Sequence, residues 1–300
     1  MAKRELTLKD RLSRLSFRQA CKLLGDEGER LIMQGGKFPV GSIEENVYLG
    51  DDLFRLSVEG AVVTITLMAE AKSRLHFNCT ACRDVCEHIG AAFALILEEK
   101  TVLGLAKPPA ERVPAESLSE AELVAQALED RAERAKTERM KIESTQPRVL
   151  WTDYIVTNNL SGKSYRVALR GWQRGQSYCS CPDFRKNTLG ICKHIMKVQR
   201  SVERKFASST RKRPYQQKEF AVHLAYGQQL ELRLLYPEKM DRQAAAIIKP
   251  IRDRAINDVL GLLRCVQKLE AMGCDVTIYP DAQEHIEFIL HQERIARLVA

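Results

Sequence analysis

Hydrophobic and polar positions in the first hundred residues follow two different periods, which predict helices and a strand. Apolar residues near the N-terminus recur at helical spacing, and this pattern ends at Gly35-Gly36, a typical helix stop. Residues 63–67, VTITL, alternate as in a half-buried strand. The apolar run 89–97 returns to helical spacing. We therefore expect a helical start, then a strand, then a second helix.

The middle of the chain repeats this order after an interruption. Prolines mark residues 107–117 as a linker, and Ser119 with Glu122 forms a capping box that opens a charged helix, expected to run to about Ile142 as a spacer. A turn at 161–162 and alternation over 165–169 then predict a hairpin strand, and a further strand leads to Cys179. The pattern predicts one supersecondary unit used twice.

The last third contains a different set of elements. Residues 220–236 are strand-like, 255–272 form an amphipathic helix, and 276–278 form a short strand before a helix capped by Asp281 and Glu284. The expected fold is α+β, with two small ββα zinc-finger-like units joined by a helical linker and followed by a small α/β segment. The expected domains are 1–105, 106–147 (linker and charged helix), 148–207, 208–218 (basic linker) and 219–300.

Four residues in the second unit have the donor types and spacing of a structural zinc site. Cys179 and Cys181 are two apart in a strand and so face one side, while Cys192 and His194 precede a helix. Three sulfurs and one nitrogen match a closed tetrahedral Zn²⁺ site, which stabilises a fold and leaves no open position for catalysis. A unit of about forty residues is small for a hydrophobic core alone, so we expect the metal to act as the core.

The first unit offers a related group, Cys79, Cys82, Cys86 and His88. Correspondence with the second unit favours a second Zn²⁺ site. Two alternatives remain, a redox pair at Cys79 and Cys82 or a site that no longer binds metal. Three further cysteines lie apart from both groups and are expected to be buried as small hydrophobes.

The net charge of +8 is concentrated in one stretch. Residues 193–218 contain nine bases and one acid, which accounts for the whole excess. A one-signed cluster favours contact with nucleic-acid phosphates, although a solvated helix face and linker would have the same composition. The expected contacts are Lys197, Arg200, Arg204, Lys205, Arg211, Lys212 and Arg213.

The second unit resembles a SWIM-type zinc finger, whose pattern is CxC, a variable loop and then CxH. The resemblance implies that Cys179, Cys181, Cys192 and His194 are the zinc ligands. The first unit departs from the pattern, with CxxC in place of CxC. The paired units followed by an α/β segment are also similar to the N-terminal region of bacterial SWI/SNF-type helicase-like ATPases. That resemblance implies an ATPase part encoded downstream or carried by another chain.

These patterns favour a zinc-binding, DNA-binding module over an enzyme. Residues 161–164 match only the tail of a phosphate loop, because Thr157 stands where the first glycine is required, and other catalytic motifs are missing. A zinc-stabilised protein-interaction scaffold is the alternative function. The longest apolar run has nine residues, too short to cross a membrane, and the N-terminus lacks a signal-peptide pattern, so a cytoplasmic location is expected.

Overall fold

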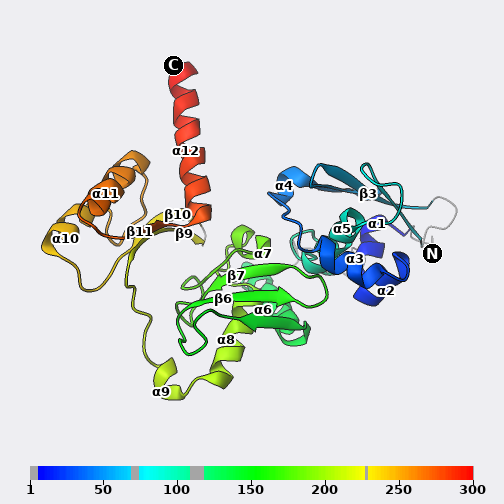
Figure 1. Cartoon of the computed structure of the whole chain (residues 1–300), viewed down its shortest axis with the longest axis horizontal. Helices are drawn as coiled ribbons and strands as arrows, with labels where there is room; N and C mark the ends of the chain where they lie inside the picture. The colour runs from blue at the N-terminus through cyan, green and yellow to red at the C-terminus, as the bar shows by residue number, and fades with distance from the viewer. Residues whose placement is uncertain (1–5, 69–73, 109–117, 227–228, 300) are drawn as a thin grey trace. The chain divides into compact units, whose positions relative to one another are not determined.

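A computed structural model describes residues 6–68, 74–108, 118–226 and 229–299, and its contacts divide the chain into two compact units (Figure 1). The first of these compact units (hereafter the first unit) extends to Leu169, also includes Ser177–Lys186 and Ile191–Phe206, and contains the cysteine groups of both zinc-finger-like units predicted from the sequence. The second compact unit (hereafter the second unit) contains the rest. Most of the predicted proline-rich linker, residues 109–117, lies outside the described residues.

The first unit begins with short helices that lead into a four-stranded antiparallel sheet. Two of these helices start at capping boxes, Thr7 with Asp10 and Ser16 with Gln19. The strands pair in chain order, and a helix follows the last of them. The elements are α1 (Leu8–Ser13), α2 (Phe17–Leu23), α3 (Gly28–Gly35), α4 (Ile43–Asn46), β1 (Val47–Leu49), β2 (Leu53–Val58), β3 (Ala61–Leu67), β4 (Leu75–Cys79) and α5 (Glu87–Glu98).

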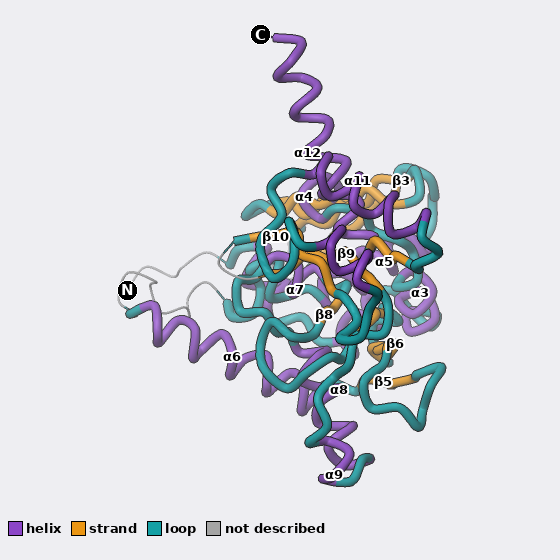
Figure 2. The backbone as a smooth tube through the Cα atoms, turned by 90° about the vertical axis from the view of Figure 1, so that its left-hand side faces the viewer, coloured by secondary structure: helices purple, strands orange, loops and turns teal. Residues whose placement is uncertain are grey.

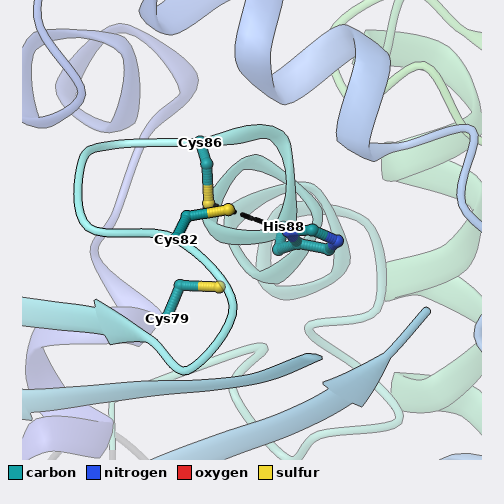
Figure 3. A group of neighbouring side chains, drawn as sticks. All are labelled: Cys79, Cys82, Cys86 and His88. Carbon is teal, nitrogen blue, oxygen red and sulfur yellow. Dashed lines mark hydrogen bonds between the residues drawn. The ribbon is translucent and has the colours of Figure 1, made fainter. Parts of the chain in front are cut away.

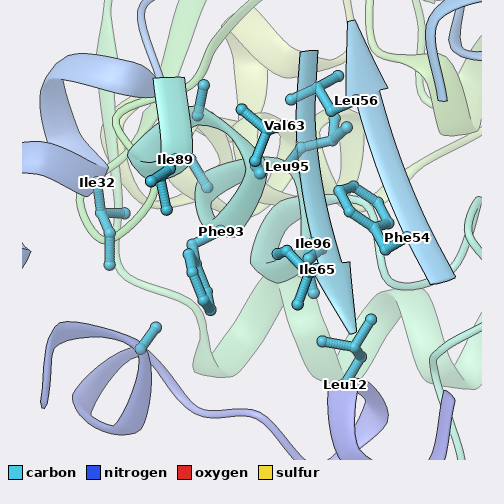
Figure 4. Close-up of a cluster of buried hydrophobic side chains, with 14 of the residues drawn as sticks. Leu12, Ile32, Phe54, Leu56, Val63, Ile65, Ile89, Phe93, Leu95 and Ile96 are labelled. Carbon is cyan, nitrogen blue, oxygen red and sulfur yellow. The ribbon is translucent and has the colours of Figure 1, made fainter. Parts of the chain in front are cut away.

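An extended hydrophobic core fills the space between this sheet and α5 (Figure 4). Phe54 of β2 and Ile65 of β3 face Phe93 and Ile96 of α5, and all four are fully buried. The expectation that metal serves as the core is therefore wrong for this half of the chain. The N-terminal helices and the sheet supply the apolar area that a forty-residue unit lacks.

A second four-stranded antiparallel sheet repeats the same strand order within the first unit. Cys79 pairs with Val63 at the end of the first sheet, and Cys179 pairs with Val167 at the end of the second. Each cysteine group thus belongs to a four-stranded meander followed by a helix, which is larger than the expected ββα unit. The elements are β5 (Met140–Glu143), β6 (Asp153–Asn158), β7 (Ser164–Ala168), β8 (Tyr178–Cys179), α7 (Pro182–Lys186) and α8 (Lys193–Lys205).

Helix α6 (Glu120–Thr137) packs along α8 rather than acting as a free spacer (Figure 2). Its predicted capping box is confirmed, since Ser119 and Glu122 bond reciprocally. The expected extension to Ile142 is wrong, because residues 140–143 pair with β6 as the edge strand β5. Strand pairing overrides helix propensity there.

The second unit is a small α/β fold with its own core. The stretch 220–236, predicted as strand-like, contains the antiparallel pair β9 and β10, and the predicted short strand 276–278 runs parallel to β9. None of the helices in the described part of the chain combines the length and apolar character needed to cross a bilayer. The elements are α9 (Ser208–Arg211), β9 (Phe220–Tyr226), β10 (Leu230–Leu235), α10 (Arg242–Ile248), α11 (Val259–Ala271), β11 (Val276–Ile278) and α12 (Pro280–Val299).

Candidate metal centres and a cationic groove

The fold gathers Cys179, Cys181, Cys192 and His194 into one buried cluster. Strand β8 ends at Cys179, and Cys181 follows just before α7. Cys192 is the N-cap of α8, so His194 lies in the first helical turn. One donor atom from each residue lies within 4.8 Å of every other. The sequence-predicted ligands therefore meet at a single point.

The spacing of these atoms fits a tetrahedral zinc ion. With Zn–S bonds of about 2.3 Å and Zn–N bonds of about 2.1 Å, a tetrahedral site separates sulfur from nitrogen by roughly 3.6 Å. His194 Nδ1 lies 3.8 Å from Cys179 Sγ and 4.0 Å from Cys192 Sγ. Only small shifts would be needed to reach the ideal separation.

The three buried cysteine thiols of this cluster favour binding of a cation. Burial raises the pKa of Cys179 well above its ordinary value and that of Cys181 to about 11. Burial also opposes ionisation of Cys192, but hydrogen bonds from Cys179 and Cys181 lower its pKa to about 5. Crowded, buried thiols of this kind bind metal as thiolates, and the charge of Zn²⁺ would offset the cost of ionising them.

A buried ionic network anchors the Cys192-Lys193-His194 segment. Lys193 Nζ lies 2.6 Å from Glu98 Oε1 and 2.8 Å from Glu138 Oε2. Burial would raise the pKa of Glu98, but Lys193 and His194 together hold it well below its ordinary value. Arg134 Nε donates to Glu138 Oε1 at 2.6 Å. Lys193, counted above among the bases of the cationic stretch, is therefore buried and neutralised.

The first group has the same design with greater exposure (Figure 3). Cys79 ends β4, Cys82 follows in the loop, Cys86 is the N-cap of α5, and His88 lies in its first turn. His88 Nδ1 lies 3.7 Å from Cys82 Sγ and 3.9 Å from Cys86 Sγ. Cys79 is buried, whereas the other three side chains are half-buried. This donor set also fits zinc.

The two groups are close structural repeats. Cys86 and Cys192 have nearly the same backbone conformation, with φ and ψ of −140° and 173° in the first and −143° and 172° in the second. Cys79 and Cys179 hold the same place at the end of the fourth strand. The extra residue in CxxC therefore falls between the strand end and the second cysteine, and leaves the strand and the helix start in place.

Four of the seven predicted nucleic-acid contacts lie together beside the second group. Lys197, Arg200, Arg204 and Lys205 of α8 line a groove of about 490 Å³ with Lys136 of α6. Ala135, Met140, Ile142 and Ser201 complete the lining, and among the described residues no acidic side chain belongs to it. Lys197 also donates to the Glu138 carbonyl at 2.8 Å. The groove is electropositive.

The other three predicted contacts belong to the second unit. Lys212 and Arg213 are exposed after α9, whereas Arg211 is half-buried and its carbonyl accepts a hydrogen bond from Trp172. The nearby aromatic side chain of Tyr215 is half-buried, and its hydroxyl donates to Gln217 Oε1.

Two residues that shape these sites were not predicted from the sequence. Lys136 joins the groove because α6 packs on α8, and the sequence gives no sign of that contact. Glu98 is the last residue of a strongly apolar helix. A carboxylate at the end of such a helix indicates that it is buried and paired with a polar side chain, and this feature could have identified Glu98 from the sequence.

Comparison with known protein families supports this assignment for part of the chain. Residues 155–198 match the family model of the SWIM zinc finger, and this range contains the second group and much of its sheet. SWIM is a binding module rather than a catalytic domain. The chain thus contains a SWIM zinc finger and a second Cys/His group compatible with Zn²⁺. No curated protein and no solved structure matches the chain.

Proposed function

We propose that this chain is a zinc-stabilised module that binds nucleic acid, and DNA in particular, through the groove between α6 and α8. Zinc is held by Cys179, Cys181, Cys192 and His194 at one site, and by Cys79, Cys82, Cys86 and His88 at the other. When bound, zinc supplies structural cross-linking at these closed sites.

The observation that carries the proposal is the five-cation lining of the groove. Arg200, Arg204 and Lys205 are exposed on α8, whose N-terminal end holds two of the proposed ligands. Metal binding at that end would fix the helix and thus the spacing of its basic side chains. Contacts of basic side chains with phosphates give affinity without sequence selectivity.

The salt dependence of DNA binding tests this proposal. A protein that contacts about five phosphates should lose several hundredfold in affinity for duplex DNA between 50 and 200 mM salt. Arg200→Gln with Arg204→Gln should reduce the slope of log K against log salt by about 2. The matched control, Lys249→Gln with Lys268→Gln, removes two exposed lysines of the second unit and should leave the slope unchanged. An unaltered slope in the groove variant would exclude the groove.

We propose that Arg211, Lys212 and Arg213 of the second unit also contact nucleic-acid phosphates. Replacing all three with glutamine should lower the salt slope further. A slope equal to that of the wild type would remove this segment from the interface.

We also propose that the chain is a regulatory or targeting part of a SWI/SNF-type helicase system. This role is suggested by the similarity of the paired units and the following α/β segment to the N-terminal region of such ATPases, as described from the sequence. Adding the purified chain to the helicase-like ATPase of its own cell should change DNA-stimulated ATP hydrolysis. The Arg200→Gln, Arg204→Gln variant should have a smaller effect, and equal effects of the two proteins would contradict targeting through the groove.

A second candidate function, docking of another protein, is favoured by apolar side chains on α12. Phe288 is 59% exposed and Ile295 is 42% exposed. If the chain is a scaffold without a nucleic-acid role, its affinity for DNA should be negligible at 50 mM salt. Phe288→Ser should then weaken binding of the protein partner.

A further inference from the structure

Helix α5 connects the two cysteine groups directly. Cys86 is its N-cap, His88 lies in its first turn, and the helix ends at Glu98. Glu98 is fully buried among residues of the second sheet and α8. At about 1.5 Å per residue, the 12 residues of α5 form a rod of roughly 18 Å. One end therefore lies at the first group and the other end lies beside the second.

The carboxylate of Glu98 is bonded on both oxygens. Oε2 accepts hydrogen bonds from Asn158 Nδ2 and Ser161 Oγ, each at 2.7 Å. Oε1 lies 2.6 Å from Lys193 Nζ and 3.3 Å from His194 Nε2. Because an ionised carboxylate only accepts, His194 must donate its Nε2 proton to Glu98. That tautomer leaves the lone pair on Nδ1, the nitrogen that faces Cys179 and Cys192.

We propose that Glu98 is the positioning residue for His194, and that through α5 it makes zinc binding at the two groups mutually supportive. A carboxylate that accepts from the second nitrogen of a ligating histidine fixes the ring and its tautomer. Here that carboxylate is supplied by the helix whose first turn belongs to the other group. Zinc at the first group fixes the start of α5 and so holds Glu98 in place, and by linkage zinc at the second group supports the first equally.

Close packing makes α5 suited to transmit this effect. Gly35 of α3 and Gly90 of α5 allow the two helices to approach so closely that a Cβ at Gly90 would overlap the Leu31 carbonyl oxygen. At its far end, the Glu98 carbonyl accepts from Arg134 Nη2 at 2.8 Å, and the next residue, Glu99, accepts from Tyr165 at 2.5 Å. The helix is thus held at both ends and along its length.

The inference rests on the proposed zinc sites and is tested on the full chain by competition with a chromophoric chelator. Glu98→Gln should weaken zinc at the second group by about 10- to 100-fold. Glu129→Gln, which neutralises an exposed carboxylate of α6, is the control and should change the affinity less than about twofold. Equal affinities of the two variants would overturn the role of Glu98.

A double-mutant cycle tests the link between the groups. Cys82→Ser, which disables the first group, should weaken zinc at the second by at least about fivefold. In the Glu98→Gln chain the same substitution should add little, because the connection is already broken. Independent, multiplicative effects of the two substitutions would overturn the coupling.

A measurement on the zinc-loaded wild type tests the role of Glu98 even if the Glu98→Gln variant fails to fold. Nitrogen-15 NMR should show the His194 proton on Nε2, with slow exchange, and Nδ1 without a proton. A proton on Nδ1 would contradict the positioning role. A wild-type chain that takes up no zinc would refute the proposed function itself, whereas a zinc-loaded chain insensitive to Glu98→Gln would refute this inference alone.

Discussion

The guanidinium of Arg131 and the carboxylate of Asp183 form a buried, two-point ion pair. Nη2 lies 2.5 Å from Oδ1, and Nε lies 3.0 Å from Oδ2. The pair ties α6 to the short helix that follows Cys181, with side-chain exposures of 8% and 11%. Burial makes the loss of one partner costly, because the other charge then remains uncompensated.

Arg131→Ala should therefore lower the free energy of unfolding by about 3 to 5 kcal/mol. Urea unfolding of the zinc-loaded chain is the measurement. Lys141→Gln breaks an exposed pair with Glu143 and should cost less than about 1 kcal/mol. Arg131→Met combined with Asp183→Leu should recover much of the loss, and a double variant as unstable as Arg131→Ala would contradict this explanation.

The crossing of α3 and α5 should not tolerate a methyl group. In Gly90→Ala the new Cβ would meet backbone atoms of Leu31, so the helices must move apart. We expect a loss of about 3 kcal/mol in thermal or urea unfolding. At Gly50 the nearest atoms belong to the end of the Tyr48 side chain, which can turn away. Gly50→Ala should therefore be nearly neutral, and equal effects at both glycines would contradict close packing.

The second unit should lose stability in mild acid because of His223. Burial, aided by the positive charge of Arg170, lowers the pKa of this histidine to about 4. The unfolded chain protonates His223 below about 6.5, whereas the folded chain resists protonation until about pH 4. The contribution of neutral His223 to the free energy of unfolding is therefore fully present above pH 6.5. It decreases as the pH drops towards 4, by up to about 3 kcal/mol.

Unfolding measured between pH 7 and 4 should show a shallower decline for His223→Gln than for the wild type. His291→Gln, which replaces an exposed histidine of α12, serves as the control and should follow the wild-type curve. Parallel curves for the wild type and His223→Gln would show that this histidine does not contribute.

The two metal groups should release zinc at different rates. The first group has three half-buried ligands, whereas all four ligands of the second are buried. Excess chelator should therefore remove one zinc ion quickly and the other slowly. Cys82→Ser should abolish the fast phase and Cys181→Ser the slow one. A single phase in the wild type, or the reverse assignment, would contradict the difference in exposure.

Much of the local structure could be predicted from the sequence because local chemistry determines it. The capping box at Ser119, the hairpin turn at Gly162 and the short strand 276–278 all follow from neighbouring residues. The repeated Cys/His spacing also predicted two groups that the fold brings together. The SWIM match to residues 155–198 confirms the predicted finger.

The missed features depend on contacts between distant segments. Residues 140–143 have helical spacing but become a strand because β6 offers a partner. The charged helix α6 has a thin apolar stripe, and polar contacts of Arg131 with Asp183 and of Arg134 with the Glu98 carbonyl contribute to its docking. The sequence predicts a helix stop at Gly35, but the second role of this glycine in the close crossing depends on Gly90, 55 residues away. Periodicity within one segment carries no information on such pairings.

Zinc content is the most direct test of the central claim that two Cys/His groups hold metal. Elemental analysis of the chain purified without added metal should give about two zinc ions for the wild type and about one for Cys181→Ser. Cys265→Ser, which changes a cysteine outside both groups, should retain about two. A zinc content near zero in a natively folded wild-type chain would contradict the account.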